Sequence, residues 1–147
     1  MKVAVGSDER TSLTDFVLRE LRARGFEVET CGALAGEDMQ WPEVGLRVAE
    51  EVAAGRCREG VLFCWTGTGV SIAANKVPGV RAALCADAET ARGARIWNHA
   101  NVLVMGLRLT SEAVAAEILE AWYTTGYGKG GDEENVGRVS EIEQKYR

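Results

Sequence analysis

Short apolar runs alternate with amphipathic stretches along most of this chain. The apolar runs span residues 2–6, 26–30, 60–64, 80–85 and 101–105. Between them, hydrophobic residues recur every three or four positions, as they do on one face of a helix. Strands that alternate with helices in this way indicate βαβ units. The pattern therefore predicts an α/β protein, a three-layer α/β/α sandwich around a five-stranded, Rossmann-like parallel sheet.

Capping and helix-breaking residues indicate where the helices begin and end. Ser12, with Asp15 three residues later, has the form of a capping box, and Gly25 is expected to end that helix. Pro42 suits the first turn of a second helix. Further helices are expected over 69–75 and 87–97, and after Thr110 or Ser111. The core-facing residues are expected to be Val44, Val48, Ala49 and Val52 in the second helix and Val114, Ile118 and Trp122 in the last of these.

The composition changes after residue 125. Residues 126–135 are rich in glycine and charge, which predicts a flexible joint. Residues 136–147 predict a short helix with Val139, Ile142 and Tyr146 on one side. Because so short a helix is marginal alone, it should pack on the domain or on a partner subunit. The chain is thus expected to comprise a domain at 1–125 and a tail at 126–147.

The length and the net charge of the chain argue against several classes of function. The 147 residues, 46% of them hydrophobic, suit one domain with its own core. The net charge of −5 argues against nucleic acid and anionic membranes as partners. Without a secretory signal or a long apolar run, we expect a cytoplasmic protein with four reduced cysteines and no membrane span. A single histidine argues against a multi-histidine metal site, and no metal or cofactor is expected.

Ligands of open parallel sheets bind beyond the carboxyl ends of the strands. That rule selects residues 7–10, 64–69 and 86–87. Gly67 and Gly69 would let a ligand approach the backbone, and free N–H groups there suit an anion. A tight turn alone would explain the same two glycines equally well.

Three polar side chains near these loops have two interpretations each. Cys64 ends the third strand, where most cysteines only pack, although a thiolate beside free N–H groups can act as a base. Asp8 is either a loop cap or a group that holds a hydroxyl and moves its proton. His99 lies before the fifth strand, at the opposite end of the sheet, and matters only if it reaches a neighbour's site.

Residues 60–76 read Gly-Val-Leu-Phe-Cys-Trp-Thr-Gly-Thr-Gly-Val-Ser-Ile-Ala-Ala-Asn-Lys. This stretch resembles the signature of the ribose-5-phosphate isomerase B / galactose-6-phosphate isomerase family. Similar pieces occur at 6–8, 79–82, 101–103 and 106–108, so the resemblance runs from the first residue to about Trp122. It implies a metal-free aldose–ketose isomerase that acts on a sugar or sugar phosphate through an enediolate.

The resemblance also implies roles for individual residues. Cys64 would be the proton-transfer base, Asp8 would assist ring opening, and Thr66 would help to stabilise the anion. Each site would be shared by two subunits of a homodimer or homotetramer, with the segment before the fifth strand reaching the neighbour's pocket. The implied substrate-binding residues are Glu9, Arg10, Trp41, Trp65, Gly67, Thr68, Gly69, Ser71, Asn75, Trp97, Asn98, His99, Arg108 and Arg138.

Several positions depart from the family pattern. Two histidines of the family are replaced, the ring-opening one by Trp97 and the one in the first loop by Glu9. Trp65 stands in place of a glycine and Trp41 in place of a tyrosine. The two phosphate-binding arginines of the family align with Gly131 and Asn135, with Arg138 close by as a substitute.

These departures predict an altered substrate. Indoles stack on the apolar faces of sugars, while Glu9 would repel a phosphate unless Arg10 offset it. The substrate would be smaller than ribose 5-phosphate or unphosphorylated, and a tetrose phosphate would not need a ring-opening histidine. One alternative is a catalytically weak protein that binds a sugar or sugar acid. A flavodoxin-like phosphate module is disfavoured because no phosphate-loop lysine follows Gly69.

Overall fold

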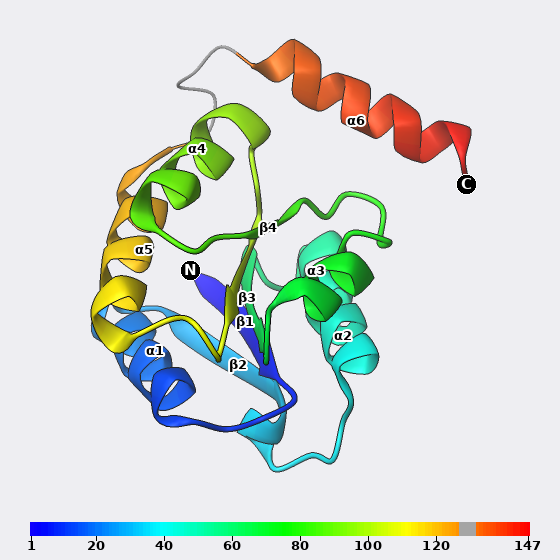
Figure 1. Ribbon diagram of the computed structural model, residues 1–147. Helices are drawn as coiled ribbons and strands as arrows, with labels where there is room; N and C mark the ends of the chain where they lie inside the picture. Colours follow the sequence, from blue (N-terminus) through cyan, green and yellow to red (C-terminus); the bar gives the residue numbers. More distant parts are fainter. Residues whose placement is uncertain (127–131) are drawn as a thin grey trace.

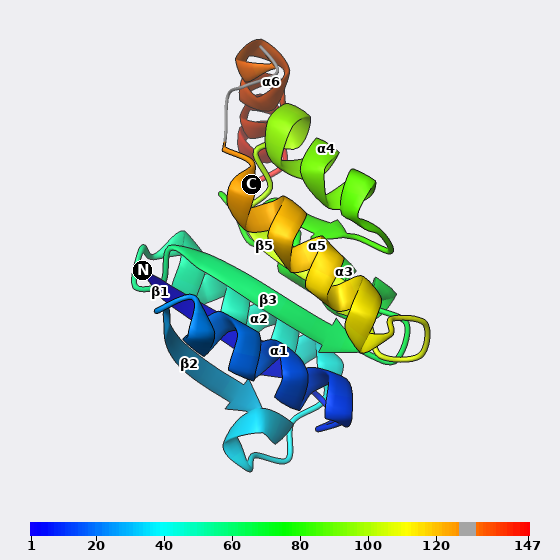
Figure 2. The same ribbon diagram turned by 90° about the vertical axis from the view of Figure 1, so that its left-hand side faces the viewer.

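The computed structural model describes residues 1–126 and 132–147. Five parallel strands form one sheet in the order β2-β1-β3-β5-β4. Helices α2 and α3 cover one face, and α1, α4 and α5 cover the other (Figures 1 and 2). The predicted three-layer sandwich is therefore confirmed. The elements are β1 (Lys2–Ser7), α1 (Ser12–Ala23), β2 (Glu27–Gly32), the 3₁₀ helix η1 (Ala33–Ala35), α2 (Trp41–Ala53), β3 (Glu59–Cys64), α3 (Thr68–Ala74), β4 (Ala82–Leu84), α4 (Ala88–Asn98), β5 (Val102–Gly106), α5 (Glu112–Thr124) and α6 (Glu133–Lys145).

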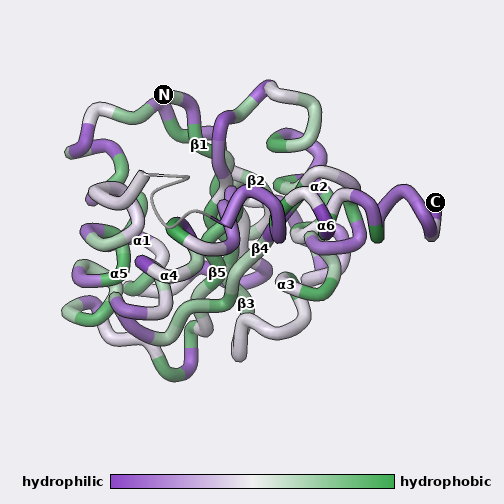
Figure 3. Tube along the Cα trace, turned by 90° about the horizontal axis from the view of Figure 1, so that it is seen from above, coloured by the Kyte–Doolittle hydropathy of each residue, from purple (hydrophilic) through white to green (hydrophobic). Residues whose placement is uncertain are grey.

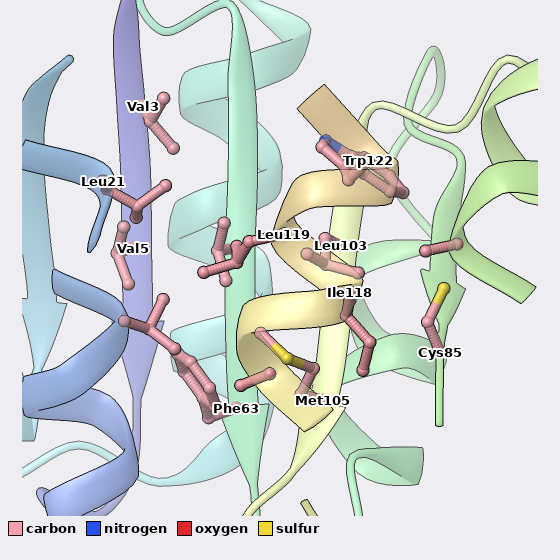
Figure 4. Close-up of a cluster of buried hydrophobic side chains, with 14 of the residues drawn as sticks. Val3, Val5, Leu21, Phe63, Cys85, Leu103, Met105, Ile118, Leu119 and Trp122 are labelled. Atoms are coloured by element: carbon pink, nitrogen blue, oxygen red, sulfur yellow. The ribbon is translucent and has the colours of Figure 1, made fainter. Parts of the chain in front are cut away.

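The core lies on both faces of the central strand β3, which is buried throughout. On one face, strand residues pack against Ile118, Leu119 and Trp122 of α5 (Figure 4). On the other face, the predicted inward side of α2 is buried as expected. Burying these side chains removes apolar surface from water, the main favourable term in folding. None of the described helices has the length and apolar character needed to span a membrane.

The first helix begins differently from the prediction. Its cap is Thr11, whose Oγ1 accepts from the N–H of Thr14, while the Thr14 hydroxyl accepts from the N–H of Thr11. The predicted pair of Ser12 and Asp15 was therefore wrong. Two hydroxyls satisfy the free N–H groups reciprocally, which leaves the Asp15 carboxylate to bind Arg10 instead.

Strand β4 is shorter than the predicted run at 80–85. Side-chain amides take the hydrogen bonds that a longer strand would use. Asn101 Oδ1 accepts from the N–H of Arg81, and the Asn75 amide bonds both the N–H and the C=O of Ala82. At this edge of the sheet, the side chains of two asparagines therefore hold the backbone of residues 81–82, and β4 forms fewer hydrogen bonds with its neighbouring strand.

The tail helix α6 begins at Glu133, three residues before its predicted start. Glu133 and Glu134 in the first turn interact favourably with the helix dipole and account for the earlier start. The predicted joint at 126–135 thus overlaps the helix, and residues 127–131 lie outside the described part. Val139, Ile142 and Tyr146 share the predicted face and line one groove, yet they are 44–76% exposed. Figure 3 shows α6 as a largely hydrophilic segment with isolated apolar positions.

Candidate active site

A glycine loop joins β3 to α3. It starts at Cys64, which pairs with Gly106 of β5 in the sheet register. Gly67 has a φ of 79°, and a Cβ there would lie 2.5 Å from Leu84 Cδ1 and 3.2 Å from the Gly106 nitrogen. Only glycine meets both demands, because it tolerates positive φ and has no side chain to clash. The loop at 64–69 is thus held close to the ends of β4 and β5.

Hydrogen bonds fix this loop in place. The N–H of Leu107 donates to the Cys64 carbonyl and the N–H of Arg108 donates to the Trp65 carbonyl, both at 2.9 Å. The hydroxyls of Thr66 and Thr68 lie 2.8 Å apart. The predicted anion-binding residues of this loop therefore form one rigid turn with two hydroxyls on it, and exposed Arg108 lies beside it.

Cys64 lies at the base of the loop with 6% of its surface exposed. The other three cysteines sit elsewhere in the fold, and burial raises the pKa of Cys31 to about 11. Burial likewise raises the pKa values of Cys57 and Cys85 to about 12, so these thiols resist ionisation. Cys64 is the cysteine that ends a strand at the glycine loop, as predicted.

Asp8 comes from the neighbouring strand. Ser7 of β1 pairs with Phe63 of β3, so Asp8 follows its strand at the level where Cys64 ends β3. Burial, helped by the charge of Glu9, raises the pKa of Asp8 above its ordinary value. The buried Ser7 hydroxyl accepts from the N–H of Glu9 and steadies this turn.

The structure pairs Arg10 with a residue other than Glu9. The Arg10 guanidinium binds the Asp15 carboxylate at 2.9 Å, and this pairing raises the pKa of Arg10. Asp15 lies in the first turn of α1. Glu9 is exposed beside Asp8, so the mouth of the candidate site carries two adjacent carboxylates.

Two of the indoles lie at the same end of the sheet. Trp41 begins α2, and its ring occupies the space where a Cβ of Gly69 would stand, 2.8 Å from Trp41 Cε3. Trp65 follows Cys64 directly and is more than half exposed. Ser71 lies in the first turn of α3, where its N–H donates to the Gly67 carbonyl. The loop is therefore flanked by aromatic surface that suits the apolar face of a sugar.

The remaining predicted residues lie at the opposite end. Trp97, Asn98 and His99 end α4 just before β5 begins, whereas Cys64 pairs with the last residue of β5. Four residue steps of strand separate these levels, about 13 Å. The Asn75 amide is occupied by the backbone of Ala82. Arg138, in α6, binds Glu134 at 3.0 Å.

A large groove lies at this second end, between α6, α4 and the chain before β4. Its volume is about 1030 Å³, and Trp97, Asn98, Val139, Ile142 and Tyr146 line part of it. Cys64, Asp8 and Thr66 do not line it. One chain therefore carries the two halves of the predicted site at separate ends (Figure 1).

Some contributors to the loop were missed by the sequence reasoning. Leu84 packs where a Cβ at Gly67 would go, and a Cβ at Gly106 would lie 2.7 Å from the Thr66 carbonyl oxygen. A glycine at the end of the fifth strand was the one signal for this close approach. The contact of Leu84 depends on strand order, which no local pattern reveals.

One group of described residues has spacing suitable for a metal ion. Glu29, Glu51 and Cys57 place ligand atoms within 4.8 Å of one another, on β2, α2 and the turn before β3. Their charges are already compensated, because Lys2 lies 3.5 Å from Glu29 and Arg56 lies 3.0 Å from Glu51. We therefore interpret this group as part of an ion-pair network that lies away from the glycine loop.

Comparison with known proteins identifies relatives of this chain. A family model described as ribose/galactose isomerase matches residues 3–142. The chain is 36% identical to ribose-5-phosphate isomerase B of Escherichia coli, covering 98% of this chain and 97% of that protein. It is 32% identical to D-erythrulose-4-phosphate isomerase of Pectobacterium atrosepticum, with coverage of 99% and 97%. The structure of ribose-5-phosphate isomerase B from Clostridium thermocellum superposes with a TM-score of 0.93 at 40% identity over both whole chains. The chain therefore belongs to the ribose/galactose isomerase family of aldose–ketose isomerases.

Proposed function

We propose that this enzyme interconverts a short sugar phosphate between its aldose and ketose forms, with Cys64 as the proton-transfer base. The observation that carries the proposal is the convergence of three groups at one end of the sheet. Cys64 ends β3, Asp8 follows β1 at the same level, and the rigid loop at 66–69 lies above them. No cofactor is needed for a proton transfer between adjacent carbons.

The chemistry follows from these positions. The Cys64 thiolate removes the proton from C2, and the electron pair of that C–H bond forms the C1–C2 double bond of an enediolate. Amide N–H groups of Gly67, Thr68 and Gly69, with the Thr66 hydroxyl, stabilise the oxyanion; each such donor contributes about 2.7–4 kcal/mol. Asp8 carries the hydroxyl proton from O2 to O1, and the Cys64 thiol, which exchanges its proton with water in part of the turnovers, donates a proton to C1. Atoms and charge balance without an oxidant.

A four-carbon substrate suits the site best. The aldose form of a tetrose 4-phosphate cannot close the usual ring because its phosphate occupies the closing oxygen, so no ring-opening group is required. Trp97 stands where the family resemblance places the ring-opening histidine, so this chain lacks that group at that position. The relative named D-erythrulose-4-phosphate isomerase supports this size class. Exposed Glu9 further disfavours a phosphate placed close to Asp8, because Arg10 is paired with Asp15.

A substrate panel tests this assignment. We expect kcat/KM for D-erythrulose 4-phosphate to exceed that for ribose 5-phosphate at least about tenfold, a difference of about 1.4 kcal/mol in transition-state binding. Steady-state assays of both sugars at pH 7.5 measure the ratio. Equal or better turnover of ribose 5-phosphate would contradict the short-chain assignment while leaving isomerase activity in place.

Completion of the site calls for a second copy of this chain. The apolar face of α6 is left uncovered, although a helix of its length needs packing to be stable. Exposed apolar side chains also surround the glycine loop, namely Trp65, Ile72, Leu84 and Leu109. In a two-fold dimer the groove of each copy would receive the loop end of the other. Trp97, Asn98 and His99 of one subunit would then border the Cys64 loop of its partner, in a cytoplasmic enzyme with its cysteines reduced.

The oligomeric state tests this arrangement. Ile142→Asp should yield a monomer by sedimentation velocity at micromolar concentration and lower kcat/KM about 100-fold or more, because a buried unpaired charge opposes association. Gln144→Asp adds the same charge to α6 outside the groove and should remain dimeric and active. A wild-type protein that sediments as a monomer with full activity would refute the shared site.

A further inference from the structure

Gly93 lies in the middle of α4 without an obvious reason to be glycine. Inside a helix, glycine is less stable than alanine because it loses more backbone freedom on folding. A Cβ at Gly93 would stand 2.8 Å from Trp97 Cζ3 and 2.9 Å from Cε3. The Trp97 indole therefore folds back along its own helix, as side chains four residues apart can do, and occupies the space that glycine leaves.

The backbone around Trp97 is held so that it cannot shift to make room. Arg95 is buried, with Nη2 2.7 Å from Glu59 Oε2 and Nη1 2.8 Å from the Ala100 carbonyl oxygen. Its guanidinium lies 4.6 Å from the centre of the Trp122 ring, and the Trp122 indole N–H donates to the second Glu59 oxygen. Because Glu59, Ala100 and Trp122 fix Arg95 and with it the end of the helix, a side chain at 93 would move the indole and leave the helix in place.

The indole that Gly93 admits faces the groove. Trp97 is 48% exposed and lines the groove with Asn98 and the apolar face of α6. In the proposed dimer this groove holds the loop end of the second subunit. The depth to which the indole projects then decides how much room remains beyond the Cys64 loop for the substrate chain.

We infer that Gly93 is a specificity-determining position that acts through Trp97. Gly93 leaves room for the Trp97 indole to lie against α4, so that the indole forms a wall at the far end of the partner's pocket. A pocket closed at this depth admits a four-carbon sugar phosphate and excludes longer ones. This inference rests on the proposed function. Gly93 is a positioning residue, since it touches the indole and not the substrate.

A double-mutant cycle tests it. Trp97→Ala removes the wall and should raise the kcat/KM ratio of five-carbon to four-carbon sugar phosphate about tenfold or more. Gly93→Ala pushes the indole into the pocket and should lower kcat/KM for the four-carbon sugar about fivefold or more, mainly through KM, with a lower Tm. The double variant should regain the Tm and the sugar ratio of Trp97→Ala, because the clash is gone.

Gly137→Ala provides the matched control. Gly137 lies in α6 and a Cβ there meets nothing within 4 Å, so this variant should keep both the sugar ratio and the Tm or raise the Tm. If Gly93→Ala does not fold, the comparison of the double variant with Trp97→Ala still decides the question.

Two results would overturn the inference. One is additive effects of the two substitutions, and the other is an unchanged sugar ratio in Trp97→Ala. Either result, with a wild-type enzyme that isomerises the four-carbon sugar, would leave the proposed function standing. A wild-type enzyme inactive on both sugars would instead remove the proposed function and this inference with it.

Discussion

Replacing Cys64 by serine should lower kcat about 1000-fold, within the range of about 10²–10⁴ for a positioned acid–base group. Serine keeps the size of the side chain, but its hydroxyl ionises far less readily than a thiol and cannot take the C2 proton. KM should change little, because the amide donors of the 66–69 loop and the threonine hydroxyls remain. Steady-state assays with the four-carbon sugar phosphate measure the loss.

Cys31→Ser is the matched control. Cys31 lies next to Gly6 on the α2 side of the sheet. Burial raises the pKa of Cys31 to about 11, so its side chain is a thiol at neutral pH. Its replacement should leave kcat within about twofold, since no proton transfer passes through it. A Cys64→Ser enzyme with kcat close to wild type would mean that another group removes the proton.

Glu59→Gln should destabilise the protein by about 3–5 kcal/mol. The Glu59 carboxylate binds Arg95 through one oxygen and accepts the Trp122 N–H through the other, with both charged side chains buried. Glutamine keeps an acceptor for Trp122 but turns an amide toward the guanidinium, which removes the carboxylate charge that faces the buried Arg95. The Tm should fall by about 10 °C in calorimetry at a fixed protein concentration.

The control for this prediction lies on α4, the helix that carries Arg95. Glu89 and Arg92 form an exposed ion pair at the start of α4, where water screens the charges. Glu89→Gln should therefore leave the Tm within about 2 °C. An equally small effect of Glu59→Gln would show that the buried pair does not hold α4 to β3.

The layer arrangement was predictable because hydrophobic periodicity is local. The run Val61-Leu62-Phe63 is buried on both sides exactly where a central strand requires it to be, and Gly67 adopts the positive φ that a strand-to-helix turn needs. Cys64 could be placed at the carboxyl end of that strand for the same reason. Spacing alone could not distinguish a catalytic Cys64 from a cysteine that only packs in the core. The family resemblance favoured the catalytic role.

Contacts between distant segments were out of reach of the sequence. Glu59 and Arg95 are 36 positions apart, and their pairing depends on where α4 crosses the sheet. The cap at Thr11 was missed because Thr11 and Ser12 both carry a hydroxyl that can cap a helix, and they lie one residue apart. Gly93 and Trp97 show a helical spacing of four, but only the structure reveals that the indole folds back onto the glycine.

The central claim is that the Cys64 thiol carries hydrogen between two neighbouring carbons of the sugar. It can be tested by incubating the four-carbon aldose phosphate in deuterium oxide and following C2 by proton NMR. We predict that the wild-type enzyme and Cys31→Ser replace the C2 hydrogen of the aldose with deuterium during reversible turnover, because the Cys64 thiol exchanges its proton with the solvent before it reprotonates the enediolate. Cys64→Ser should bind the sugar and leave C2 unlabelled. Deuterium entering C2 at the wild-type rate with Cys64→Ser would contradict the account.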